Sequence, residues 1–145
     1  MAVTPNSARL KKLMGITNDV PHRMNTITVT STTRTLQPSE SGAIVFLAGT
    51  ACTVTLPAPA DGLYYEFYST TEVLHIVQAQ TNVINGNYRH NSATTTMTRV
   101  AVVNQGKLTL HSSGRAIGDR LQFWSDGTNW WLDGIVNHAL TVTTV

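Results

Sequence analysis

Short runs of alternating apolar and polar residues cover most of the chain and predict β-strands. In TITVT, Ile27 and Val29 alternate with threonines, and in CTVTLP, Val54 and Leu56 do the same. Side chains two residues apart lie on one face of a strand, so each run would bury one face. GAIVFLAG, residues 42–49, is apolar throughout and short enough for a strand that is buried on both faces.

Segments of this kind recur from Thr26 onward. They follow one another about every 8–12 residues, the spacing expected of a sandwich or barrel. The pattern therefore predicts an all-β fold, a single compact antiparallel β-sandwich or barrel of jelly-roll type. Its further strand candidates are LYYEFYS, VLHIVQA, RLQFW, WWLDGIV and ALTVTTV.

Two further segments predict a change of chain direction. VINGNY contains Asn85-Gly86, and this pair predicts a tight turn. TRVAVVNQGKLTLHSS is a hairpin candidate with Asn104-Gln105-Gly106 as its loop.

A third turn separates two tryptophan-containing strands. SDGTN, residues 125–129, predicts a hairpin loop in which Gly127 adopts a positive φ. In the strand that follows, Trp130 and Trp131 must point to opposite faces. One indole therefore enters the core, and the other meets water, a partner or a ligand.

Residues 1–24 differ from the rest and predict an N-terminal arm, with 25–145 as the β-domain. In NSARLKKLMG, Asn6 or Ser7 can cap a short helix and Gly15 can end it. A helix this short is marginal by itself in water, so it either packs on the β-domain or waits for a partner. The apolar residues of its one face are Leu10, Leu13 and Met14.

Composition supports the β assignment and argues against two classes of partner. The chain holds 23 threonines in 145 residues, and 12% of its residues are charged. Threonine is β-branched and suits strands with one solvated face. The net charge is +2 and the basic residues are scattered, so we expect no nucleic-acid partner. No apolar run approaches the roughly 18 residues of a membrane helix, so we expect no membrane association. The N-terminal basic residues are not followed by an apolar region, so we expect no signal peptide.

The sequence predicts no enzyme, no cofactor and no metal site. The five histidines are far apart, without the spacing of a metal-binding motif. Asp61, Asp126 and Asp133 each precede a glycine, which is typical of turn-forming residues. Cys52 lies in an apolar run that predicts a small buried hydrophobe, which is the wrong setting for a Cys–His nucleophile. A metal cluster assembled by the fold, or by one histidine repeated at a trimer axis, stays open as an alternative.

Aromatic residues have two interpretations, a carbohydrate-stacking surface or a mixture of core and subunit contact. Alternating aromatic residues in β-proteins usually line the core, so the sugar surface is the lesser interpretation. The residues considered are Trp124 and Tyr68, together with the exposed contact candidates Tyr64, Tyr65, Trp130 and Trp131.

Several short motifs follow one another between residues 33 and 134. Their order resembles that of small virion proteins of tailed bacteriophages, the capsid decoration (cement) and head-fibre proteins, which tend to be trimeric β-structures. The matching pieces are Thr35-Leu36, Ser41-Gly42, Val54-Thr55-Leu56-Pro57, Ala60-Asp61-Gly62-Leu63-Tyr64 with Phe67, Gly118-Asp119, and Ser125-Asp126-Gly127 through Trp130.

The resemblance implies a structural role in a virion. We expect a capsid decoration protein, made in the host cytoplasm, that binds the outer surface of the assembled head as a homotrimer and stabilises the shell. Its partners would be the major capsid protein and itself. An alternative is a fibre- or tail-associated module that binds a receptor or a polysaccharide. The expected capsid-contact residues all lie in the arm: Arg9, Leu10, Lys11, Lys12, Leu13, Met14 and Arg23.

The two ends of the β-domain suggest where subunits meet. TITVTST and ALTVTTV are rich in threonine and valine. Strands of this composition at sheet edges would invite aggregation if they stayed unpaired. We therefore expect neighbouring subunits to cover them.

Overall fold

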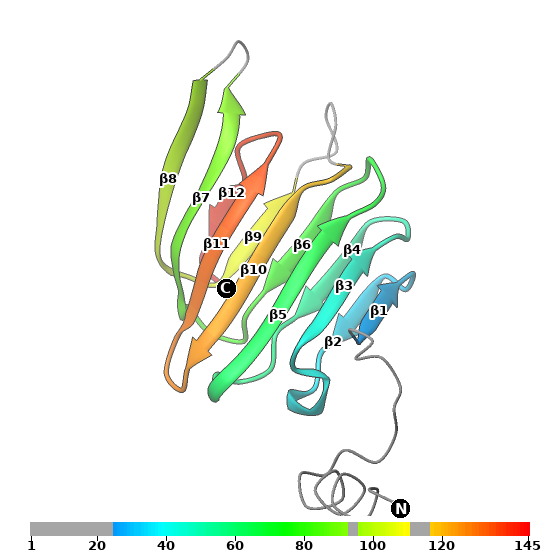
Figure 1. Cartoon of the computed structure of the whole chain (residues 1–145), viewed down its shortest axis with the longest axis vertical. Helices are drawn as coiled ribbons and strands as arrows, with labels where there is room; N and C mark the ends of the chain where they lie inside the picture. The colour runs from blue at the N-terminus through cyan, green and yellow to red at the C-terminus, as the bar shows by residue number, and fades with distance from the viewer. Residues whose placement is uncertain (1–24, 93–95, 111–116) are drawn as a thin grey trace, which may run out of the picture.

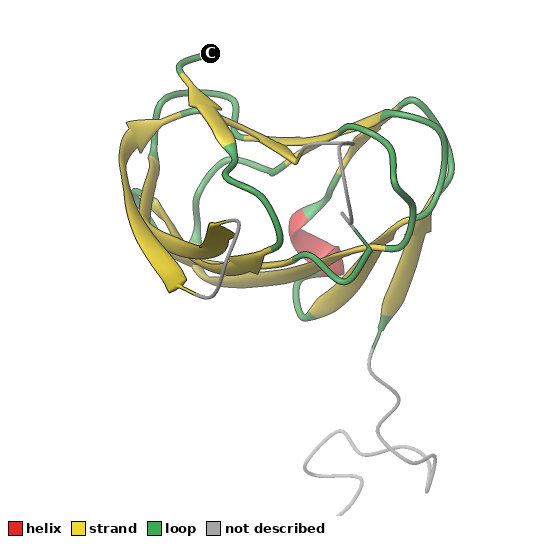
Figure 2. Ribbon diagram, turned by 90° about the horizontal axis from the view of Figure 1, so that it is seen from above, coloured by secondary structure: helices red, strands yellow, loops and turns green. Residues whose placement is uncertain are grey.

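Two β-sheets packed face to face form the described part of the chain, residues 25–92, 96–110 and 117–145 of a computed structural model (Figure 2). This confirms the predicted all-β sandwich, whereas the predicted arm and all its capsid-contact candidates lie outside the described residues. The strands are β1 (Thr26–Val29), β2 (Thr33–Thr35), β3 (Ala43–Leu47), β4 (Cys52–Thr55), β5 (Asp61–Ser69), β6 (His75–Gln78), β7 (Ile84–Ser92), β8 (Thr96–Gln105), β9 (Lys107–Leu110), β10 (Arg120–Asp126), β11 (Trp130–Val136) and β12 (Thr141–Thr143). The seven-stranded sheet has the order β1-β3-β5-β10-β11-β7-β8, and the five-stranded sheet has the order β12-β9-β6-β4-β2.

The first six strands form a coil that passes alternately between the two sheets (Figure 1). β1, β3 and β5 are neighbours in the seven-stranded sheet, and β2, β4 and β6 are neighbours in the five-stranded sheet. All of these pairs are parallel, with Thr26 opposite Ile44 and Thr53 opposite Ile76. The expectation of antiparallel pairing throughout is therefore wrong. A chain that changes sheet at every step returns to each sheet in the same direction.

The last six strands complete the two sheets. β10 and β11 form an antiparallel hairpin in which Trp124 lies opposite Trp131. This hairpin lies between β5 and β7, so β10 pairs with β5 and β11 pairs with β7. The loop predicted at residues 125–129 is confirmed, and Gly127 has a φ of 91°.

The other two predicted turns are wrong. Asn85-Gly86 lies inside β7, where Gly86 has a φ of 130° and the register with β8 shifts between Ile84 and Gly86. A glycine with positive φ suits a bulge as well as a turn, so the local signal was ambiguous. Residues 104–106 carry the chain from β8 in one sheet to β9 in the other, rather than closing a hairpin.

A short 3₁₀ turn, η1 (Pro38–Glu40), connects β2 to β3. The Glu40 carboxylate accepts a hydrogen bond from the Gln37 backbone N–H at 2.8 Å and pairs with Arg34 of β2. Across the described ranges, no helix is long and apolar enough to cross a membrane.

Two large aromatic side chains occupy the core between the sheets. Trp130 and Tyr65 are fully buried, with ring centroids 5.8 Å apart. The Trp130 Nε1–H donates to the Pro57 carbonyl at 3.1 Å, and the Tyr65 hydroxyl donates to the Gln37 carbonyl at 2.7 Å. Burial raises the pKa of Tyr65 to about 12. Tyr65 was expected to be exposed, and for Trp130 and Trp131 the sequence predicted only that one of the two indoles is buried. Strand alternation turns Tyr65 and Trp130 inward, while their neighbours point outward.

Within the described residues, each sheet has two edge strands. β1 and β12, the threonine-rich segments at the two ends of the β-domain, are edge strands, as are β2 and β8. β8 is ten residues long, and its first four residues are all exposed. Because successive side chains point to opposite faces, both faces of this end of the β7–β8 hairpin are uncovered, and the hairpin extends past the other strands (Figure 1).

Candidate functional site

The outer face of the seven-stranded sheet, which is turned away from the core, carries aromatic and polar side chains in register. The strand pairing aligns them in rows that run across β5, β10, β11 and β7. The aromatic row contains Tyr64, Trp124 and Trp131 and ends at Asn85. The polar row next to it contains Glu66, Gln122, Asp133 and Asn87.

The aromatic row exposes two indoles on neighbouring strands. Trp124 is 44% exposed and Trp131 is 38% exposed, although both are among the largest apolar side chains of the protein. Neighbouring strands lie about 4.8 Å apart, so the three aromatic residues span roughly 10 Å across the sheet. Exposed aromatic residues that lie together in this way are typical of a binding surface rather than of a solvated face.

The hairpin loop fixes the orientation of Trp131. The Asp126 Oδ2 accepts a hydrogen bond from Trp131 Nε1–H at 2.7 Å. Its Oδ1 accepts from the backbone N–H groups of Asn129 at 2.8 Å and Thr128 at 2.9 Å. The hydrogen bonds from Asn129, Trp131 and Thr128 lower the pKa of Asp126 to about 2. The residue that forms the turn therefore stays ionised at neutral pH and holds the indole in place.

A second cluster fixes the other end of the aromatic row. The hydroxyls of Tyr64 and Tyr68 donate to the Glu66 carboxylate at 3.0 and 2.8 Å, and the Arg120 guanidinium lies 3.8 Å from it. The Gln122 Nε2–H donates to the Tyr64 hydroxyl at 3.0 Å. Burial, followed by the contact with Glu66, raises the pKa of Tyr64. Glu66 is 8% exposed and hydrogen-bonded through both oxygens, so its role is to position its neighbours.

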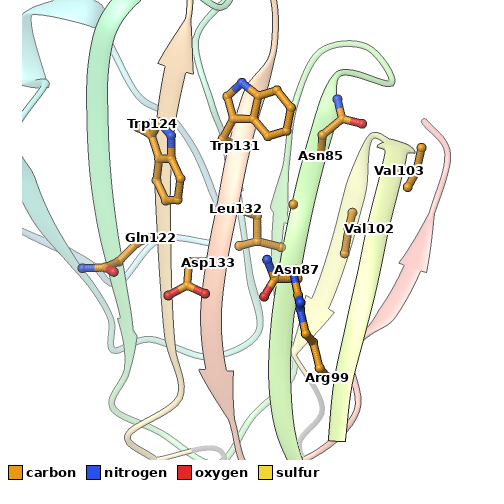
Figure 3. A pocket seen from close by; sticks show the side chains of 11 residues that line it. Asn85, Asn87, Arg99, Val102, Val103, Gln122, Trp124, Trp131, Leu132 and Asp133 are labelled. Carbon is orange, nitrogen blue, oxygen red and sulfur yellow. The ribbon is translucent and has the colours of Figure 1, made fainter.

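A cavity of about 560 Å³ lies beside the two indoles (Figure 3). Its volume is within the range of small-ligand sites in proteins. Its wall includes one acidic and one basic side chain, Asp133 and Arg99. The side chains that line it are those of Asn85, Asn87, Arg99, Val102, Val103, Gln122, Trp124, Trp131, Leu132 and Asp133.

The structure places the four aromatic contact candidates on different sides of the sheet. Tyr64 and Trp131 lie on the outer face, half-buried and exposed respectively, whereas Tyr65 and Trp130 lie in the core. Trp124, which was not among the four candidates, is the most exposed tryptophan. The alternation in RLQFWSD and the hairpin loop at residues 125–129 together provide a signal that pairs Trp124 with Trp131.

A buried thiol–imidazole pair lies away from the outer face. The Cys52 Sγ is 3.0 Å from His75 Nδ1, and the Thr71 hydroxyl is 2.9 Å from His75 Nε2. Cys52 is 2% exposed, which confirms its predicted burial. Burial raises the pKa of the Cys52 thiol and lowers the pKa of His75. Both shifts favour the neutral forms, whereas a nucleophilic pair needs a thiolate and an imidazolium.

The burial of His75 makes the folding stability depend on pH. The folded-state pKa of His75 lies below its usual value of 6.5, so the unfolded chain takes up the proton first as the pH falls. We expect stability to fall with pH below this value, with a slope that His75→Gln removes. Urea unfolding at about pH 7.5 and about pH 5.5 measures this slope, with His90→Gln as the control that retains it. Equal slopes in wild type and His75→Gln would contradict the assignment.

Within residues 25–92, 96–110 and 117–145, no three His, Cys, Asp or Glu side chains come together in a way that could hold a metal ion. No protein-family model, no curated protein and no solved structure matches this chain.

Proposed function

We propose that this chain is a capsid decoration protein of a tailed phage, which binds the outer surface of the assembled head as a homotrimer and stabilises the shell. The motifs that resemble phage virion proteins contact one another in the fold, which supports the proposal. Pro57 of the VTLP segment accepts the Trp130 indole N–H of the SDG-x-x-W segment. Ser41 of the SG pair accepts a hydrogen bond through its hydroxyl oxygen from the Tyr64 backbone N–H of the ADGLY segment at 3.0 Å.

The observation that carries the homotrimer is the open edge of β8. Met97 on this strand is 50% exposed, and the first four residues of the strand are uncovered on both faces. A two-stranded hairpin without a covering layer is marginally stable in water. A neighbouring copy that packs against this hairpin buries it and removes the edge. Three copies that repeat this contact around a three-fold axis form a closed trimer.

The arm, residues 1–24, is proposed to contact the major capsid protein. Its basic residues, Arg9, Lys11, Lys12 and Arg23, stand against a single acidic residue, Asp19. The first strand after the arm, β1, is itself an edge strand. An arm that orders on binding reaches a wide surface on the shell. Attachment to the assembled lattice, and not to loose subunits, stabilises the shell by mass action.

Light scattering coupled to size exclusion tests the subunit contact. We expect the full-length protein and a version that begins at Met24 both to have the mass of a trimer. Met97→Lys in the full-length protein should give a monomer, because a charge would be buried at the β8 contact. The matched control is Ile117→Lys, since Ile117 is also exposed, at 56%. A monomeric wild-type protein at micromolar concentration would contradict the proposal.

Co-sedimentation tests the shell contact separately. The full-length protein is mixed with empty heads of the phage that encodes it. We expect saturable binding that the version beginning at Met24 loses while it stays trimeric. Normal occupancy by the shortened version would remove the arm from the proposal.

A further inference from the structure

We propose that the outer face of the seven-stranded sheet binds a neutral oligosaccharide, seated on Trp124 and Trp131 and hydrogen-bonded in the adjoining cavity. This inference does not depend on attachment to a capsid, because it rests on side chains of the β-sandwich alone. A pyranose ring has faces of C–H bonds and a rim of hydroxyl groups. The aromatic row offers flat apolar surfaces to the C–H faces, and the cavity offers polar groups to the rim.

Three polar side chains of the cavity wall can form hydrogen bonds with a ligand. Within the described part of the chain, the Asn87 amide, the Asp133 carboxylate and the Arg99 guanidinium form no side-chain hydrogen bond, and all three line the cavity (Figure 3). An amide both donates and accepts, a carboxylate accepts, and a guanidinium donates. This mixture suits hydroxyl groups, each of which also donates and accepts. An apolar peptide would leave these groups without partners, at a cost in free energy.

The charge of the cavity favours a neutral ligand. Asp133 is the acidic side chain of the wall and Arg99 is the basic one, so their formal charges cancel. Sites for acidic polysaccharides or phosphates collect basic side chains instead. In the next row of the sheet, the Arg120 guanidinium lies 3.8 Å from the Glu66 carboxylate, so these two charges also balance.

The aromatic row is rigid before any ligand arrives. Asp126 holds the Trp131 indole, and Glu66 holds the Tyr64 hydroxyl, which in turn accepts a hydrogen bond from Gln122. Binding to fixed side chains loses less conformational entropy than binding to mobile ones. This support is typical of a built site, since a merely solvated tryptophan needs no anchor.

The length of the site favours several sugar units. The aromatic row lies on β5, β10 and β11, and the cavity extends over β7 and β8. Five neighbouring strands span roughly 19 Å. A single ring would cover only part of this distance, so the ligand is an extended oligosaccharide that runs across the strands.

Isothermal titration calorimetry on the full-length protein tests the proposal. The probes are cellohexaose, maltohexaose and mannohexaose, with hexagalacturonate as the acidic comparator. We expect at least one neutral hexasaccharide to bind, and Trp124→Ala and Trp131→Ala each to weaken binding at least about tenfold. Asp126→Asn should weaken it several-fold through the loss of the Trp131 anchor. The matched control is Ile135→Ala, an exposed outer-face residue of β11 outside the cavity, which should bind like the wild type.

Three results would overturn the proposal. These are binding of hexagalacturonate alone, no binding of any neutral probe, or an equal loss in Ile135→Ala. Light scattering of Trp131→Ala distinguishes a further occupant of the same face, a second copy of this chain. If this variant fell apart into monomers while remaining folded, the face would be a subunit interface and not a sugar site.

Discussion

Trp130→Ala is expected to lower the free energy of unfolding by about 3–5 kcal/mol, the usual cost of removing a buried tryptophan side chain. The indole is fully buried between the sheets and packs against Tyr65. Its N–H also satisfies the Pro57 carbonyl, which the variant leaves without this donor. Urea unfolding, followed by far-UV circular dichroism, measures the loss.

The neighbouring tryptophan provides the control. Trp131 lies on the outer face, 38% exposed, so Trp131→Ala should leave the unfolding midpoint nearly unchanged. The two variants remove the same atoms from adjacent positions of one strand. If Trp131→Ala destabilised the protein as much as Trp130→Ala, the assignment of inner and outer faces of β11 would be incorrect.

Gly86→Ala is expected to destabilise the protein by about 2–5 kcal/mol, from backbone strain of roughly 1–2 and overpacking of roughly 1–3 kcal/mol. Gly86 has a φ of 130°, and a Cβ at this position would lie 2.1 Å from the Leu132 carbonyl oxygen and 2.7 Å from the Leu132 nitrogen. Both atoms belong to the backbone of β11, so β7 would have to move away from it. Because Gly86 also lines the cavity, the variant should lose oligosaccharide binding together with stability.

Gly42→Ala separates the two contributions. Gly42 also has a positive φ, 86°, but nothing lies within 4 Å of an added Cβ. This variant should show only the strain of a left-handed residue, roughly 1–2 kcal/mol. Equal losses in unfolding experiments on the two variants would mean that the contact between β7 and β11 is looser than the structure indicates.

The local parts of the fold could be predicted from the sequence. Alternation located most strands, and Asp126-Gly127 located the β10–β11 hairpin, because its strands are joined by a short loop. The parallel coil could not be predicted, since each strand pairs with one a full turn further along the chain. Asn85-Gly86 was misread for a related reason. Its positive φ serves a bulge in the pairing of β7 with β8, which no local pattern specifies.

The candidate site was predictable only in part. Alternation showed that Trp130 and Trp131 face opposite sides, but which side is the core depends on the second sheet. The same dependence explains why Tyr65 was wrongly expected to be exposed. Asp133 was interpreted as a turn residue because it precedes a glycine. In the structure it lies inside β11 and lines the cavity, and its neighbours there come from β7 and β8.

The coil of the first six strands also dictates the order in which the chain folds and the place where it opens. The β10–β11 hairpin closes a short loop and can form early, whereas each turn of the coil must close a long one before its contacts form. The coil pairs residues such as Thr26 and Ile44, which are much closer in the chain than Tyr68 and Arg120 of β5 and β10. We therefore expect the coil to form before β10 pairs with β5. β1 and β2 have a neighbour on one side only, so we expect their amide hydrogens to exchange early. Residues 1–24 precede β1 in the chain, so a partner bound to them would protect an edge of the sandwich that opens readily.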